Sequence, residues 1–73
     1  MAKEVVDVPI TGKVISCDAK VGDSIKEGDT ICVIDAMKME NAIMAPRSGK
    51  IVELKAKPDQ LVEAGETLAV IEY

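Results

Sequence analysis

The residue types that could do chemistry gather in one short segment near the middle of the chain, DAMKMEN at positions 35–41. It places Lys38 between two methionines, with a carboxylate three residues before it and another two residues after it. A lysine amine is a nucleophile only when deprotonated, which is rare at neutral pH unless the protein buries it or supplies a base. This segment offers neither, so Lys38 is better suited to being acylated by another protein than to acting as a catalyst.

Composition excludes several classes of function. The chain has 73 residues, with 9 Lys plus Arg against 13 Asp plus Glu, and this acidic balance argues against binding nucleic acid. There is no histidine, and the two cysteines do not form a CxxC pair, which argues against a metal site. No apolar run approaches the roughly 20 residues that span a bilayer, and no signal-peptide pattern follows the first methionine. We therefore expect no membrane insertion and a cytoplasmic location.

The elements that must position Lys38 come from an internal repeat. The segment 9–35 aligns without a gap on the segment 46–72, with prolines and glycines in register. The matched breakers are Pro9 with Pro46, Gly12 with Gly49, and Gly28 with Gly65. Such a match indicates two copies of one structural unit, and Lys38 lies at the junction between them.

Each copy is predicted to be built from strands. Apolar and β-branched stretches at 12–19, 30–36, 49–56 and 67–73 are bounded by glycine turns, and the breakers come too often for long helices. With a single aromatic residue, Tyr73, the core must be aliphatic. We predict one all-β domain over residues 1–73, a flattened barrel or sandwich of two four-stranded sheets with internal pseudo-two-fold symmetry.

The repeat also suggests which other side chains are structural. Cys17 aligns with Leu54 and Cys32 with Ala69, so both thiols are interpreted as buried packing residues, with a redox role as the minor alternative. Met44 is interpreted as a core residue.

The segment between the copies is predicted to be a hairpin with Met37 and Lys38 as its two-residue turn. A turn of the primed kind would require positive φ at residues that are not glycine. The strand pairs expected beside the turn are Ala36 with Met39, Asp35 with Glu40, and Ile34 with Asn41.

The sequence AMKM, followed by Glu40 and Asn41 and by AP at 45–46, closely resembles the attachment motif of biotinyl carrier domains. The duplicated framework VGDSIKEGDTICVID and AGETLAVIE is similar to the same biotin/lipoyl attachment family. The resemblance implies that a biotin protein ligase biotinylates Lys38. It also implies flanking recognition positions at Ala36, Met37, Met39 and Glu40.

A biotin carboxyl carrier is a non-catalytic swinging arm. The resemblance implies that it moves a carboxyl group between a biotin carboxylase and a carboxyltransferase. The alternative is a lipoyl carrier domain, which shares the framework but usually has Asp-Lys-Ala at the tip. A hydrolase that uses Asp35 and Glu40 is a third possibility, disfavoured because a filled sandwich of this size should leave no pocket of several hundred Å³.

Overall fold

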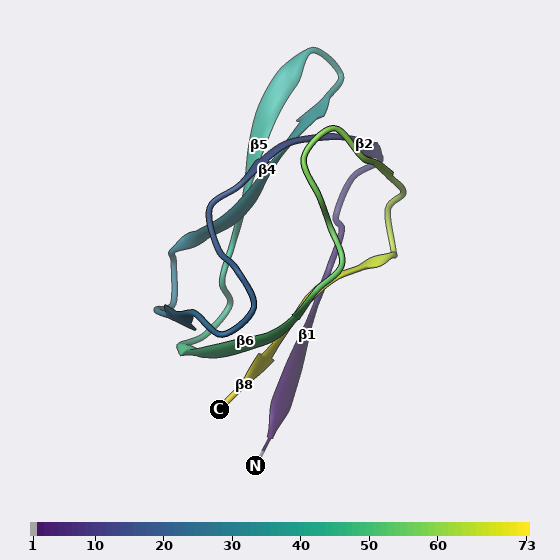
Figure 1. Cartoon of the computed structure of the whole chain (residues 1–73). Helices are drawn as coiled ribbons and strands as arrows, with labels where there is room; N and C mark the ends of the chain where they lie inside the picture. Colours follow the sequence, from purple (N-terminus) through teal and green to yellow (C-terminus); the bar gives the residue numbers. More distant parts are fainter. Residues whose placement is uncertain (1) are drawn as a thin grey trace.

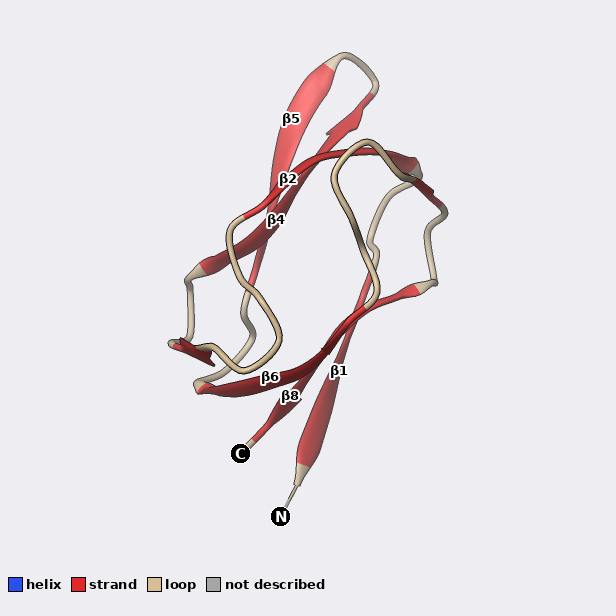
Figure 2. Cartoon of the chain, viewed as in Figure 1, coloured by secondary structure: helices blue, strands red, loops and turns tan. Residues whose placement is uncertain are grey.

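The computed structural model describes residues 2–73, which form eight β-strands joined by turns and loops, with no helix among them (Figure 2). The strands are β1 (Lys3–Asp7), β2 (Gly12–Cys17), β3 (Ser24–Ile25), β4 (Thr30–Ala36), β5 (Met39–Met44), β6 (Gly49–Leu54), β7 (Leu61–Val62) and β8 (Thr67–Glu72). The predicted strands are all present, although those expected at 12–19 and 49–56 end two residues earlier. Residues 2–73 therefore contain no helix that could cross a membrane.

The strands make two antiparallel four-stranded sheets that face each other across the core (Figure 1). One sheet has the order β1-β8-β6-β3 and the other the order β5-β4-β2-β7. This confirms the predicted all-β architecture of two four-stranded sheets.

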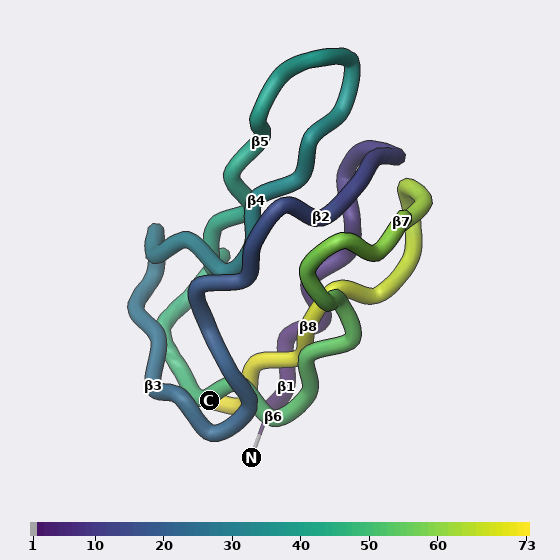
Figure 3. The backbone as a smooth tube through the Cα atoms, turned by 45° about the horizontal axis from the view of Figure 1, so that its top comes forward, coloured from purple at the N-terminus to yellow at the C-terminus, as the bar shows by residue number. Residues whose placement is uncertain are grey.

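The two repeats have the same strand pairings. In the first, β2 pairs with β4, and in the second β6 pairs with β8 in the equivalent register. Both pairs carry a bulge at the same place, between Val14 and Ser16 in β2 and between Ile51 and Glu53 in β6. The short strands are exchanged, because β3 pairs with β6 and β7 pairs with β2. Figure 3 shows the loops that carry β3 and β7 on opposite sides of the molecule. This exchange ties each repeat to the sheet of the other.

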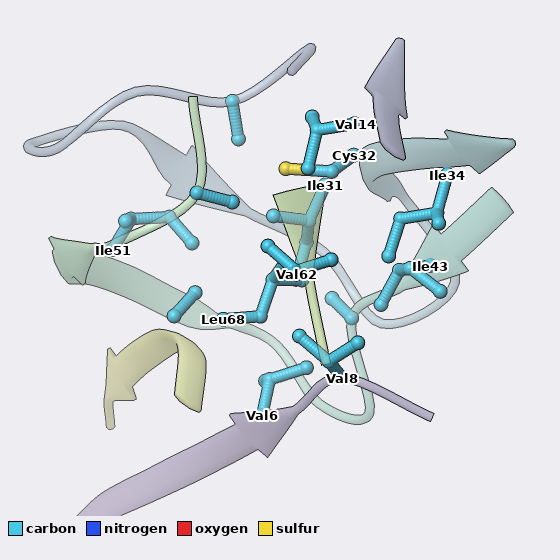
Figure 4. Close-up of a cluster of buried hydrophobic side chains, with 14 of the residues drawn as sticks. Val6, Val8, Val14, Ile31, Cys32, Ile34, Ile43, Ile51, Val62 and Leu68 are labelled. Carbon is cyan, nitrogen blue, oxygen red and sulfur yellow. The ribbon is translucent and has the colours of Figure 1, made fainter. Parts of the chain in front are cut away.

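Equivalent residues of the two repeats fill one aliphatic core between the sheets (Figure 4). The buried pairs are Val14 with Ile51, Ala19 with Ala56, Ile25 with Val62, Ile31 with Leu68, Cys32 with Ala69, and Ile34 with Ile71, and just before the repeats Val6 with Ile43 and Val8 with Ala45. Cys32 is fully buried, whereas Cys17 is half-buried and packs against the edge of this core. Burial on this scale is the main favourable term in the stability of so small a chain.

The turns that connect the strands also follow the repeat. Gly28 and Gly65 have φ of 91° and 96°, in the left-handed region that glycine adopts without steric cost. Asp59 occupies the position equivalent to Gly22, and both are left-handed, with φ of 69° and 97°. The second repeat therefore keeps the turn shape without the glycine, because Asp tolerates this region better than most residues.

The interpretation of Met44 as a core residue is wrong, because its side chain is 57% exposed. Met44 lies on the outward face of β5 opposite Thr30, and its neighbour in the core is Ile43. The equivalent residue of the other repeat could have indicated that this position is exposed. Asp7 has the equivalent place in β1, opposite Thr67, and is an exposed charged residue.

Candidate functional site

The hairpin of β4 and β5 is paired to its last residues and closes through Met37 and Lys38. The register matches the predicted one, with Ala36 opposite Met39, Asp35 opposite Glu40, and Ile34 opposite Asn41. Both turn residues are left-handed, with φ of 55° for Met37 and 63° for Lys38. Positive φ at both central positions of a two-residue hairpin loop is the mark of a type I′ turn. The turn that sequence reasoning predicted is therefore confirmed, with Lys38 at its second position.

This turn projects from one end of an elongated molecule that measures 37 × 18 × 16 Å (Figure 1). The chain termini lie at the other end, where the backbones of Ala2 and Tyr73 exchange two hydrogen bonds of 2.9 and 3.0 Å. In the internal repeat, Ala2 corresponds to Met39 and Tyr73 corresponds to Ala36, so the two pairs occupy equivalent places. The pseudo-symmetry thus puts the chain ends at one pole and the closed turn with Lys38 at the other.

The side chains at the apex are directed to solvent. Lys38 is exposed, Met37 is 84% exposed and Met39 is 66% exposed. Among the described residues, the Lys38 amine has no ion-pair or hydrogen-bond partner in the protein. Two large apolar side chains therefore flank an amine that an external active site can reach from several directions.

The base of the tip is held by close packing between β2 and β4. Ala36 is buried, and Gly12 lies against it. A Cβ atom at Gly12 would collide with the carbonyl oxygen of Asp35 and come within 2.9 Å of Ile34 Cγ2. Glycine at position 12 thus lets the two strands approach, which fixes where the hairpin leaves the body of the domain.

The carboxylates below the turn lie in a row with a lysine. Asp35 has Glu40 opposite on one side and Lys13 opposite on the other. The amine of Lys13 is also 3.8 Å from a carboxylate oxygen of Asp59. Sequence reasoning paired the two carboxylates correctly but missed Lys13. Lys50 lies opposite Glu72 in the equivalent place of the second repeat.

Two open surface hollows, of about 260 and 250 Å³, occupy equivalent places in the two repeats. Each is open to solvent and smaller than the several hundred Å³ of a typical small-molecule site, so neither contradicts the expectation that the fold leaves no such pocket. The hollow in the second repeat is lined by Lys55, Ala56, Gln60, Val62, Glu66 and Thr67, and the other by Asp18, Ala19, Asp23, Ser24, Ile25, Asp29 and Thr30. Neither hollow includes Asp35, Glu40 or a residue of the turn, so neither gives those carboxylates a substrate pocket.

Residues 4–71 match the model of the protein family described as "Biotin-requiring enzyme". The chain is 42% identical over 43 residues to the gamma subunit of methylmalonyl-CoA decarboxylase from Veillonella parvula, which covers 59% of the chain and 33% of the relative. It is 44% identical over 39 residues to the gamma subunit of glutaconyl-CoA decarboxylase from Acidaminococcus fermentans, covering 53% of the chain and 27% of that subunit. The chain thus spans a third or less of the length of these two relatives.

The fold is similar to part of the crystal structure of urea carboxylase from Kluyveromyces lactis, with a TM-score of 0.90 and 36% sequence identity. That match covers 99% of the chain and 6% of the larger protein. The chain therefore belongs to the family of biotin-requiring enzymes, in which its fold is that of a biotinyl domain. Within this family it is a biotin carrier domain of the type found in biotin-dependent carboxylases and decarboxylases, and the lipoyl alternative is not favoured.

Proposed function

We propose that residues 1–73 form a single biotinyl domain in which a biotin protein ligase attaches biotin covalently to Lys38. The observation that carries the proposal is the position of Lys38. It is an exposed amine without a protein partner among the described residues, at the apex of a type I′ turn that projects from one pole. The turn holds the lysine away from the body of the domain, and the paired strands behind it keep that position rigid.

The residues at the tip fit the chemistry of attachment. Amide formation joins Lys38 Nζ to the carbonyl carbon of an activated biotin acid, releases the activating group, and gives up a proton from the amine. Nothing at the tip acts as a base, so the ligase must supply the activation and accept the proton. The domain contributes presentation, because both residues of the turn have a fixed backbone and the amine is open to solvent.

The flanking residues have separate parts in this proposal. Met37 and Met39 offer flexible, polarizable apolar contacts that can repack against a ligase and later against other active sites. Glu40 and Asp35 present an acidic edge for basic partner surfaces. Ala36 is buried, so its part is to shape the base of the tip by packing against Gly12.

The proposed work of the modified domain is to carry a carboxyl group. Bound biotin supplies a ureido nitrogen that accepts and donates the carboxyl group. The lysine side chain together with the biotin tail reaches on the order of 14 Å from the backbone. Neither of the two surface hollows includes a residue of the turn. Tethering keeps the carboxyl group that biotin carries at an effective concentration in roughly the millimolar range for the partner active sites.

The proposed partners are a biotin carboxylase and a carboxyltransferase of a biotin-dependent carboxylase, decarboxylase or transcarboxylase, with the carrier itself non-catalytic. The names of the two decarboxylase gamma subunits support a place for the carrier within a multi-subunit biotin-dependent enzyme. We further propose a cytoplasmic location. The chain has only two cysteines, too few for the disulfide framework that small secreted domains use.

The test uses the purified chain, a biotin protein ligase, biotin and ATP, with intact mass and streptavidin binding as readouts. We expect one biotin per chain, and none on Lys38→Arg, which keeps the charge but removes the primary amine. Lys50→Arg is the matched control, because Lys50 is an exposed lysine of the second repeat; it should still accept one biotin. Biotin on Lys38→Arg, or a parent that accepts lipoate from a lipoate ligase but no biotin, would refute the proposal.

A further inference from the structure

Two thiols that the tip does not use face each other across the strand pair β2 and β4. Cys17 and Cys32 are direct partners in this ladder, and their Sγ atoms are 2.8 Å apart. A disulfide bond is about 2.05 Å long, so the two sulfurs need to move by less than 1 Å to reach bonding distance.

The backbone geometry of the pair also suits a bond. The backbone N–H of Asp18 donates to the carbonyl oxygen of Ile31 at 2.8 Å, which makes that neighbouring pair hydrogen-bonded. Because the two kinds of pair alternate along an antiparallel ladder, Cys17 and Cys32 form a non-hydrogen-bonded pair, in which Cα atoms are about 4.5 Å apart. That separation lies within the range that disulfides span, about 4.4–6.8 Å.

We propose that Cys17 and Cys32 form a reversible cross-strand disulfide when the folded domain meets a small-molecule disulfide oxidant such as glutathione disulfide. In the first step the Cys17 sulfur attacks the oxidant and releases one small thiol. In the second step the Cys32 sulfur attacks the mixed disulfide on Cys17 and releases the second. Two protein thiols are oxidised, the oxidant is reduced to two small thiols, and both protons leave with them. This proposal is independent of the function of Lys38.

The burial of the two sulfurs sets the order and the pace of these steps. Cys17 is half-buried and Cys32 is fully buried, so an external oxidant meets Cys17 first. Burial raises the pKa of Cys32, and its hydrogen bond and proximity to Cys17 and the charge of Asp18 raise it further. Its thiolate is therefore rare, and the second step is the slow one. The bond should form slowly in the native state.

The bond would close the loop 18–31 at its base. This loop carries β3 from one sheet across to pair with β6 of the other. The equivalent loop of the second repeat starts after Leu54 and ends before Ala69, which are partners in β6 and β8 and cannot form such a bond. Oxidation would thus cross-link the ends of the loop in the first repeat and leave the equivalent loop of the second repeat unchanged.

The test oxidises the purified, folded chain with excess glutathione disulfide and then alkylates free thiols in denaturant. We expect the intact mass to fall by that of two hydrogens, with no alkyl group added, and a proteolytic peptide pair that links Cys17 to Cys32. The melting temperature should rise by on the order of 10 °C through the closed loop and return to its starting value after reduction. Biotin acceptance at Lys38 should be the same in both forms.

The control variants are Cys17→Leu and Cys32→Ala, which copy the residues that the second repeat uses at these places. Each should gain no internal bond, and its melting temperature should not respond to the oxidant. Alkylation of both thiols in the parent, a glutathione adduct that persists on Cys17, covalent dimers, or an internal bond without a gain in melting temperature would each overturn the proposal.

Discussion

The tip turn is expected to lower stability, and replacing Met37 and Lys38 by Asn and Gly should raise it. Both residues have positive φ, 55° and 63°, although neither is glycine. The left-handed region costs an ordinary L-residue roughly 1–2 kcal/mol, whereas Asn-Gly is the pair that type I′ turns favour most. The parent chain therefore carries strain at the one place where its amine is presented.

The net gain is smaller than the sum of the two relieved costs. Glycine loses more conformational entropy on folding than other residues, which removes about 0.5–1 kcal/mol of the gain. Loss of the Lys38 charge changes little, because Lys38 makes no ion pair with another described residue and exposed charges contribute little to stability. We expect a net stabilisation of about 1 kcal/mol, or about 4–8 °C in melting temperature for a chain of this size.

The assay is thermal unfolding of the unmodified proteins followed by circular dichroism, with urea unfolding as a second measure. Met37→Ala with Lys38→Ala is the matched control. It removes the same side chains but keeps a Cβ at both left-handed positions, so it should show no comparable gain. The Asn-Gly variant must also lose biotinylation. If it melts at or below the temperature of the parent, or if the Ala-Ala control gains as much, the strain argument is wrong.

Three further outcomes follow from the structure. Gly12→Ala should destabilise the domain by about 1–3 kcal/mol in urea unfolding, because its Cβ collides with the Asp35 carbonyl oxygen; an unchanged midpoint would contradict the tight approach of β2 to β4. The raised pKa of Cys32 means that its thiol ionises in the unfolded chain at a lower pH than in the folded one, so the free energy of unfolding should fall as pH rises above the ordinary thiol range. Cys32→Ala should flatten that fall, and an unchanged slope would refute its assignment to Cys32. Met37→Glu should slow ligation by on the order of tenfold, equivalent to about 1.4 kcal/mol of contact, with an unchanged melting temperature; equal ligation rates would show that this methionine is not contacted.

Much of the fold could be predicted because the sequence contains the same unit twice. Matched glycines and prolines located the turns, and the core is filled by residues that align between the copies, such as Val14 with Ile51 and Ile34 with Ile71. The hairpin register followed from the turn length, since a two-residue loop leaves one way to pair the strands.

The failures came where single residues were interpreted without their equivalents. Met44 is apolar and was therefore placed in the core, yet strand alternation turns it outward, in the place that Asp7 has in the first strand. The place of Lys13 beside Asp35 depends on sheet order, which places β2 next to β4, and the order of strands in a sheet is not contained in local patterns.

The direct contact of Cys17 with Cys32 was missed for a related reason. Each thiol was compared with its equivalent in the other repeat and not with its neighbour across the ladder. The bulge between Val14 and Ser16 determines which residue of β2 lies opposite Cys32. A bulge shifts the pairing of two strands by one residue, and the sequence pattern did not predict this bulge.

Protein purified from the natural source shows whether Lys38 is the residue that carries biotin. Intact mass gives the number and identity of the attached groups, and tandem mass spectrometry of the peptides assigns each to a residue. We expect one biotin amide on Lys38 and unmodified side chains at the other lysines. An unmodified Lys38 in the native protein, a lipoyl group there, or biotin on another lysine would contradict it.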